Sequence, residues 1–257
     1  MWKRIRVGVL LLVLLVVASD AWLDRQRTTS WEHTVWVGIY PVAGDASATT
    51  AAYVASLQRG QFTAIEAFYA REARRYGLAV DPPVRIALYP PRPDAPPLLA
   101  DGAGPLARLL WSLKLRFYAW STPRAPGQPA PHIRLFVLYH DPALARLVPD
   151  SHALQKGLVG IVHAFATPAA ASSNNLVIAH ESLHTFGATD KYDLHSNAPL
   201  FPDGYGDPAA TPLYPQAYAE IMAGRRALAA SRYEEPPGLA EVVVGQRTAR
   251  EINWQKP

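Results

Sequence analysis

The chain has 257 residues and no cysteine. This absence excludes disulfide bonds, zinc sites built from thiolates and a cysteine nucleophile. Methionine is almost absent as well, because Met222 is the only one after Met1. The chain also lacks a large excess of positive or negative charge. Three of the four net positive charges lie at Lys3, Arg4 and Arg6, so the rest of the chain has a net charge of only +1. We therefore predict no nucleic-acid partner.

The basic start precedes an apolar run at residues 7–18, a pattern typical of an export segment. The run is shorter than the roughly 20 residues that span a bilayer. Small residues at 18–21 favour cleavage, whereas Asp20 and Trp22 disfavour it. Residues 1–23 are therefore expected to be either an export signal or, if uncleaved, an N-terminal membrane anchor. Both alternatives place the remainder in the periplasm or outside the cell.

Residues 24–30 are expected to be a linker, and residues 31–257 to form one domain. Hydrophobic residues make up 49% of the chain, which is enough for a sizeable core. Hydrophobic periodicity predicts strands at 34–40, 84–89, 133–139 and 157–165, and helices at 62–76 and 106–117. The first strand is expected to end at Pro41. Loops are expected at 44–50 and 90–104, and a last helix at 249–254 with Thr248 as its cap.

The sequence from His180 to Asp190 reads H-E-x-x-H-x-x-G-x-x-D. Histidines four residues apart lie on one face of a helix, so His180 and His184 can reach the same zinc ion. Glu181 is placed to take a proton from a zinc-bound water, which is the nucleophile. Gly187 is suited to end the helix, after which the chain can return Asp190 as a third ligand. Candidate N-caps for this helix are Ser172, Ser173 and Asn174.

This motif resembles that of the metzincin metallopeptidases, in the variant with aspartate as third ligand that snapalysin-type peptidases share. Metzincins also have a methionine in a tight turn beneath the zinc. Met222, 32 residues after Asp190 and followed by Gly224, fits that role. The resemblance implies an α/β (α+β) fold with a twisted mixed sheet, backing helices, a zinc helix, a Met-turn and a small C-terminal helical subdomain. It also implies that residues after Met222 line a specificity pocket.

The function expected from these features is that of an exported zinc endopeptidase with one catalytic ion and a peptide or protein substrate. Glu181 would be the general base, and Tyr192 is a candidate for contacting the oxyanion or lining the cleft. The strand at 157–165 is the best candidate for binding an extended substrate. Two other functions stay open: a non-catalytic zinc protein that binds a peptide or cell-wall partner, and a hydrolase of non-peptide amides. The oligomeric state is not predicted.

Other residues could complete the metal site. Asp193 and His195 are rival third ligands, and Glu220 would instead make the enzyme a gluzincin-type hydrolase. His163 is expected to be an ordinary strand residue. A calcium loop built from Asp193, Asp203 and Asp207 is a further alternative to a plain solvated loop, although the EF-hand spacing is missing.

Overall fold

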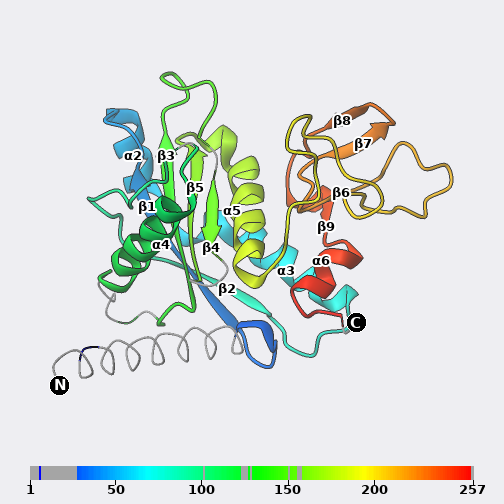
Figure 1. Ribbon diagram of the computed structural model, residues 1–257, viewed down its shortest axis with the longest axis horizontal. Helices are drawn as coiled ribbons and strands as arrows, with labels where there is room; N and C mark the ends of the chain where they lie inside the picture. The colour runs from blue at the N-terminus through cyan, green and yellow to red at the C-terminus, as the bar shows by residue number, and fades with distance from the viewer. Residues whose placement is uncertain are drawn as a thin grey trace.

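The computed structural model describes residues 6, 28–100, 102–122, 127, 129–149, 151–154 and 158–255. Its centre is a five-stranded sheet in the order β2-β1-β3-β5-β4 (Figure 1). Neighbouring strands run parallel except β4, which pairs antiparallel with β5. The α/β (α+β) class with a mixed sheet is therefore confirmed. The strands are β1 (Val35–Ala43), β2 (Val84–Leu88), β3 (Ile133–His140), β4 (His152–Leu154) and β5 (Val159–Phe165).

Both faces of the sheet are covered, as is usual for parallel strands. Alternate residues of β3 point to opposite faces. Leu135 and Val137 belong to the larger core, which includes residues of α3 (Thr63–Arg75) and α5 (Ala171–Phe186). Phe136 and Leu138 belong to a smaller core on the other face, beneath α4 (Pro105–Trp120). The sheet therefore holds α5 rigidly on the face opposite α4.

Several elements differ from their sequence-based prediction. The first strand continues through Pro41, which pairs with Val137. The expected loop at 44–50 contains the start of α2 (Ala48–Ser56), where the Ser47 hydroxyl accepts a hydrogen bond from the Thr49 amide. The sequence did not predict β4, because three residues are too few to show an alternating pattern.

The start of α5 also differs from expectation. The helix follows directly from a 3₁₀ turn, Pro168–Ala170, and Ala170 is its N-cap with no side-chain hydrogen bond. Asn174 lies within the helix instead of capping it. Its side chain accepts from the Phe165 amide at 3.0 Å and donates to the Phe165 carbonyl at 2.9 Å. This pair of bonds attaches α5 to the end of β5.

Helix α4 lies where periodicity predicted it, but the opposite face is buried. Trp111, Leu115 and Ala119 pack against the sheet. The leucines and Phe117 that carry the periodic signal are instead exposed: Leu106, Leu109, Leu110, Leu113 and Phe117.

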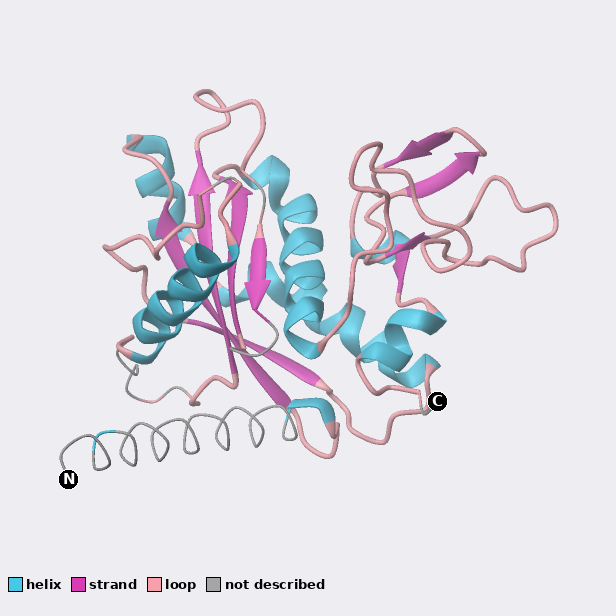
Figure 2. Ribbon diagram, viewed as in Figure 1, coloured by secondary structure: helices cyan, strands magenta, loops and turns pink. Residues whose placement is uncertain are grey.

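The chain after α5 consists mainly of loops and short strands (Figure 2). The expected small C-terminal helical subdomain has its last helix, α6 (Gln246–Glu251), but short strands and loops make up the rest of it. Its last helix begins at Gly245 as N-cap, and Thr248 lies inside it. The elements are two paired sets of strands, β6 (Ala219–Glu220) with β9 (Val242–Val243) and β7 (Arg226–Ala229) with β8 (Arg232–Glu234), and helix α6 (Gln246–Glu251); further 3₁₀ turns are Arg59–Phe62 and Leu239–Glu241.

The expected export segment, residues 1–23, lies outside the described residues apart from Arg6, and so does most of the expected linker. Within the described ranges, no helix has both the length and the hydropathy needed to cross a bilayer.

We expect Asn174→Ala to lower the free energy of unfolding by about 1–3 kcal/mol, because it leaves the part-buried Phe165 amide without its acceptor. The Phe165 carbonyl loses one of its two donors and keeps the bond from the Thr167 amide. Urea denaturation followed by circular dichroism measures the change. Ser173→Ala is the matched control, since its hydroxyl is exposed and bonds only within its own turn. Equal stability of the two variants would contradict the structural role of Asn174.

Candidate metal centre

Helix α5 presents His180, Glu181 and His184 beside its buried face. Ile178, Leu183 and other apolar residues of α5 enter the core, so the helix cannot rotate about its axis without exposing them. The two histidines stand one turn apart and are only partly buried. Their Nε2 atoms are 3.1 Å apart. Core packing of α5 therefore points both rings at the same location.

Gly187 ends α5 as the sequence predicted, in the left-handed conformation with φ 115°. A side chain there would be strained, whereas glycine adopts this conformation at little cost. The chain then turns back along the helix and brings Asp190 to the histidines. Its Oδ1 atom lies 3.2 Å from the Nε2 atom of His180 and 3.2 Å from that of His184. The structure thus gathers the three residues expected to be metal ligands.

These three atoms form a nearly equilateral triangle, with sides of 3.1, 3.2 and 3.2 Å. Tetrahedral zinc with bonds of about 2.0–2.1 Å separates its ligand atoms by about 3.3 Å. The donor set and its spacing therefore fit a zinc ion with a fourth position open.

The other ring nitrogen of each histidine is engaged by the backbone. The Nδ1 atom of His180 is 2.9 Å from the Ile221 carbonyl, and that of His184 is 2.9 Å from the Ala188 carbonyl. A carbonyl only accepts hydrogen bonds, so each Nδ1 is the protonated nitrogen. When the rings are neutral, as metal binding requires, their Nε2 lone pairs face the shared point.

Electrostatics at this point favour positive charge. Burial lowers the pKa of His180, but the hydrogen bond to Asp190 and the negative charge of Glu181 outweigh burial and raise that pKa to about 9. Burial raises the pKa of Asp190, whereas hydrogen bonds with His180 and His184 hold it well below its usual range. The cluster therefore stabilises a cation, whether a proton or a metal ion.

Glu181 is buried and lies between two cavities. A cavity of about 370 Å³ is lined by His180, Glu181 and Tyr192, and another of about 350 Å³ is lined by Glu181, His184 and Asp190. A larger one of about 760 Å³ lies elsewhere and contains none of these residues. The carboxylate of Glu181 thus stands where two halves of a cleft meet.

Met222 is fully buried in a turn stabilised by bonds from the Ala223 and Gly224 amides to the Glu220 carbonyl, both 3.1 Å. Gly224 has φ 68°, so the predicted turn after Met222 is present. The Ile221 and Met222 carbonyls both face the site region. The first accepts from His180, and the second accepts from the Lys191 amide at 2.9 Å.

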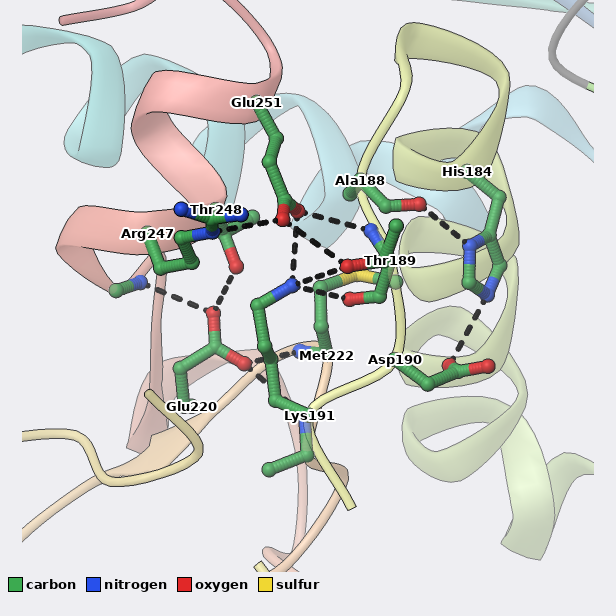
Figure 3. Close-up of polar contacts among 12 residues, drawn as sticks. His184, Ala188, Thr189, Asp190, Lys191, Glu220, Met222, Arg247, Thr248 and Glu251 are labelled. Carbon is green, nitrogen blue, oxygen red and sulfur yellow. Dashed lines mark hydrogen bonds and ion pairs between the residues drawn. The ribbon is translucent and has the colours of Figure 1, made fainter. Parts of the chain in front are cut away.

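Glu220 is not brought to the histidines. Its carboxylate accepts four hydrogen bonds: from the amides of Met222 (2.6 Å), Ala223 (3.0 Å) and Gly245 (3.0 Å), and from the Thr248 hydroxyl (2.7 Å). Burial raises its pKa, and these donors only partly offset that effect. Figure 3 shows Glu220 separated from His184 and Asp190 by Lys191 and Met222.

The remaining candidates are not part of the triangle, although His163 lines the 370 Å³ cavity together with His180 and Glu181. The Asp193 carboxylate accepts bonds from the His195 amide and from Ser196 in an exposed loop. Asp203 and Asp207 line the 760 Å³ cavity. His163 is paired with His140, with 2.9 Å between ring nitrogens. Glu181 is close to the triangle, because His180, Glu181 and His184 have potential ligand atoms within 4.8 Å of one another.

Sequence reasoning missed a buried ion pair next to Asp190. The Lys191 ammonium is 2.8 Å from the Glu251 carboxylate and also donates to the carbonyl and hydroxyl of Thr189. Glu251 accepts from the Thr189 amide at 2.9 Å (Figure 3). The pair, which we call the Lys191–Glu251 clamp, holds the residues on both sides of Asp190. No local pattern connects residues 60 positions apart, so the sequence carried no signal for it.

We expect Glu251→Gln to lower the free energy of unfolding at pH 7 by about 2–4 kcal/mol, because Lys191 keeps its buried charge without a counter-ion. Burial raises the pKa of Glu251, but bonds from Lys191 and Thr189 outweigh burial and lower it. A depressed carboxyl pKa stabilises the fold above the unfolded value of about 4.3, and that stability is lost as the pH falls through the folded value.

The difference between wild type and Glu251→Gln should therefore shrink as the pH falls from 7 to about 3. Urea unfolding at several pH values measures it. Glu241→Gln is the control, because Glu241 pairs with Arg226 at the surface and its loss should cost less than about 1 kcal/mol. A pH-independent difference for Glu251→Gln would contradict the clamp.

A scan against protein-family models and a search of curated proteins each found no match. The chemistry of this centre therefore has to be inferred from His180, Glu181, His184 and Asp190 themselves.

Proposed function

We propose that the protein is a zinc-dependent, metzincin-type endopeptidase that acts outside the cytoplasm. The observation that carries the proposal is the triangle of two imidazole nitrogens and one carboxylate oxygen, with sides of 3.1–3.2 Å, beside a buried glutamate. A structural zinc site is closed by four protein ligands, whereas three protein ligands leave room for a reactant. A non-catalytic zinc protein would not need a base next to its first ligand.

His180, His184 and Asp190 would hold the zinc ion. When bound, zinc supplies Lewis acidity, which polarises a carbonyl and makes water more acidic. The backbone carbonyls of Ile221 and Ala188 keep the two rings in the tautomer that binding requires. Because the ligands are already gathered, little reorganisation is needed to form the site.

Glu181 is the proposed general base and acid. It accepts a proton from the attacking water and then delivers it to the leaving amine. Its buried position strengthens its electrostatic interactions with charged neighbours. Both cavities open onto this side chain, so the two halves of a substrate can extend from the same point. Tyr192 lines one cavity and is a candidate for contacting the substrate or the oxyanion.

The prediction that the strand at 157–165 binds an extended substrate has to be revised. Strand β5 is paired with β3 on one side and β4 on the other, so it has no free edge along its first half. Strand β4 is the terminal strand of the sheet, and its Ala153 lines the cavity that contains His184 and Asp190. An extended peptide could add to the outer edge of β4 through main-chain hydrogen bonds.

The 370 Å³ cavity is the proposed side-chain subsite. Leu176 and Val177 give it an apolar wall, and it also contains charged Arg225 and Glu235. Ala223, Gly224 and Arg225 line it directly after Met222, as the metzincin resemblance implies. The mixed sheet with an antiparallel terminal strand and the turn at Met222 also support this type of enzyme. The gluzincin alternative is disfavoured because both carboxylate oxygens of Glu220 already accept hydrogen bonds from other groups of the chain.

We expect Glu181→Gln to keep one zinc ion per chain and to lose peptide hydrolysis by about 10²–10⁴-fold, because the amide cannot accept the proton. Metal analysis and mass spectrometry of a digested peptide library measure the two effects. The control is Glu32→Gln, an exposed glutamate remote from the cleft. A wild type that binds zinc but cleaves no amide would favour the non-catalytic zinc-binding protein. A wild type that cleaves only non-peptide amides would favour the hydrolase of such amides.

We expect Asp190→Ala to weaken zinc binding by more than about 100-fold, because loss of a residue that only orients a ligand already costs about 10–100-fold. Competition with a chromogenic chelator measures the Kd. Asp193→Ala is the matched control and should leave the Kd unchanged, since its carboxylate serves its own loop. An unchanged Kd for Asp190→Ala would rule out Asp190 as the third ligand.

A further inference from the structure

Helix α4 carries an apolar stripe on the face that points away from the sheet. Its exposed fractions run from 50% at Leu110 to 78% at Trp120, values typical of charged surface residues rather than of leucine and aromatic side chains. At 3.6 residues per turn the members fall on one side of the helix, opposite the buried Trp111 and Leu115. We call this set the α4 stripe: Leu106, Leu109, Leu110, Leu113, Phe117 and Trp120.

A surface helix normally needs only one apolar face. Monomeric soluble proteins rarely expose a large contiguous apolar patch, and such a patch usually marks a binding surface. The α4 stripe runs along nearly the whole of a 16-residue helix, a length of about 24 Å. It is therefore a surface with a partner rather than a scatter of single exposed residues.

The charges around the stripe indicate which partner. The charged residues of α4 are Arg108, Lys114 and Arg116, all of them basic, and the loop that contacts Tyr118 adds Arg92 and Asp94. Helical geometry places Lys114 on one flank of the stripe and Arg116 on the other. Apolar side chains with tryptophan on one face and flanking cations characterise helices that lie in the interface of an anionic membrane. A helix of about 24 Å is also too short to cross the bilayer comfortably.

The opposite side of the same helix reaches the candidate metal centre. Arg108 and Trp111 of α4 line the 350 Å³ cavity together with Glu181, His184 and Asp190. Figure 1 shows α4 lying across one face of the sheet. Helices α3 and α5 pack on the other face. With side chains, a helix is about 10–12 Å across, so a surface on the stripe would lie about one helix diameter from this cavity.

We propose that α4 seats the protein on an anionic lipid surface, with the stripe at the boundary between headgroups and acyl chains. Exposed Lys114 contacts lipid phosphates, and aromatic Phe117 and Trp120 lie at headgroup depth. If the proposed peptidase function holds, this docking selects substrates whose cleaved segment lies close to a membrane. The lipid contact itself does not depend on that function.

The absence of cysteine allows a direct test, because a single introduced cysteine is the only site for a thiol-reactive probe. We would label Leu113→Cys in the stripe with the environment-sensitive fluorophore NBD, using the full chain. Ser231→Cys, exposed in the β7–β8 turn, is the matched control position. Phosphatidylcholine vesicles with and without phosphatidylglycerol provide the surface. We expect blue-shifted emission and protection from iodide at residue 113 only, and mainly with phosphatidylglycerol.

Lys114→Glu in the labelled chain should weaken this response to phosphatidylglycerol vesicles by roughly 30-fold, because it changes the local charge by two. Arg232→Glu, on exposed β8, is the charge-matched control and should have no effect. Because label and control share the chain's N-terminal segment, its membrane affinity cannot produce a response at residue 113 alone.

Three results would overturn the proposal. The first is a response that is absent at residue 113 or equal at residues 113 and 231. The second is a blue shift without vesicles that grows with protein concentration, which would assign the stripe to a second copy. The third is protection from iodide without vesicles at any concentration, which would assign it to another segment of this chain. None of these readouts requires zinc or cleavage, so failure here is distinct from failure of the peptidase proposal.

Discussion

The geometry of the candidate metal centre depends on one buried carboxylate that lies outside it. Glu220 has no exposed surface, and its two oxygens accept four hydrogen bonds, two from the turn at Met222 and two from the start of α6. Leaving such buried amides without an acceptor would cost about 1–3 kcal/mol each. The turn is thereby fixed, and its carbonyls are fixed with it. One of them sets the tautomer of His180, and another holds the backbone of Lys191.

The second support reaches the centre from the other end of the same small C-terminal part. Glu251 of α6 binds the amide of Thr189 and the ammonium of Lys191, so the residues before and after Asp190 are both immobilised (Figure 3). Helix α6 therefore serves both supports, through Thr248 toward Glu220 and through Glu251 toward Lys191. This explains how an aspartate on a loop can be held as firmly as two histidines on a helix. His180, His184 and Asp190 come from α5 and the turn that follows it. Their positions are fixed by residues much later in the chain, Glu220 and Glu251.

These supports also show which features the sequence could and could not predict. The helix with His180 and His184, its end at Gly187 and the turn after Met222 follow from spacing and from the conformational freedom of glycine, which are local properties. Glu220 shows the limit, because an acidic residue beside Met222 looks the same whether it faces a metal or four hydrogen-bond donors. Asn174 is similar, since asparagine near a helix start suggests a cap, and only the fold shows that it binds Phe165. Strand β4 exists because β5 offers it an edge, which three residues of sequence cannot reveal.

Helix α4 shows why periodicity alone does not identify a core. Its strongest apolar repeat, from Leu106 to Trp120, is exposed, while a weaker set at Trp111, Leu115 and Ala119 packs on the sheet. Both sets favour a helix, so the element was predictable, but its rotation about its own axis was not. That rotation is determined by Trp111, whose indole donates to the Pro97 carbonyl at 2.7 Å while its ring fills the smaller core. Turning the helix to bury the leucines would break this bond and bring Lys114 and Arg116 closer to the apolar sheet. The unfavourable exposure of the stripe therefore persists in water because the alternative is worse, and a lipid surface would relieve it without moving Arg108 or Trp111 from the cavity beside Glu181.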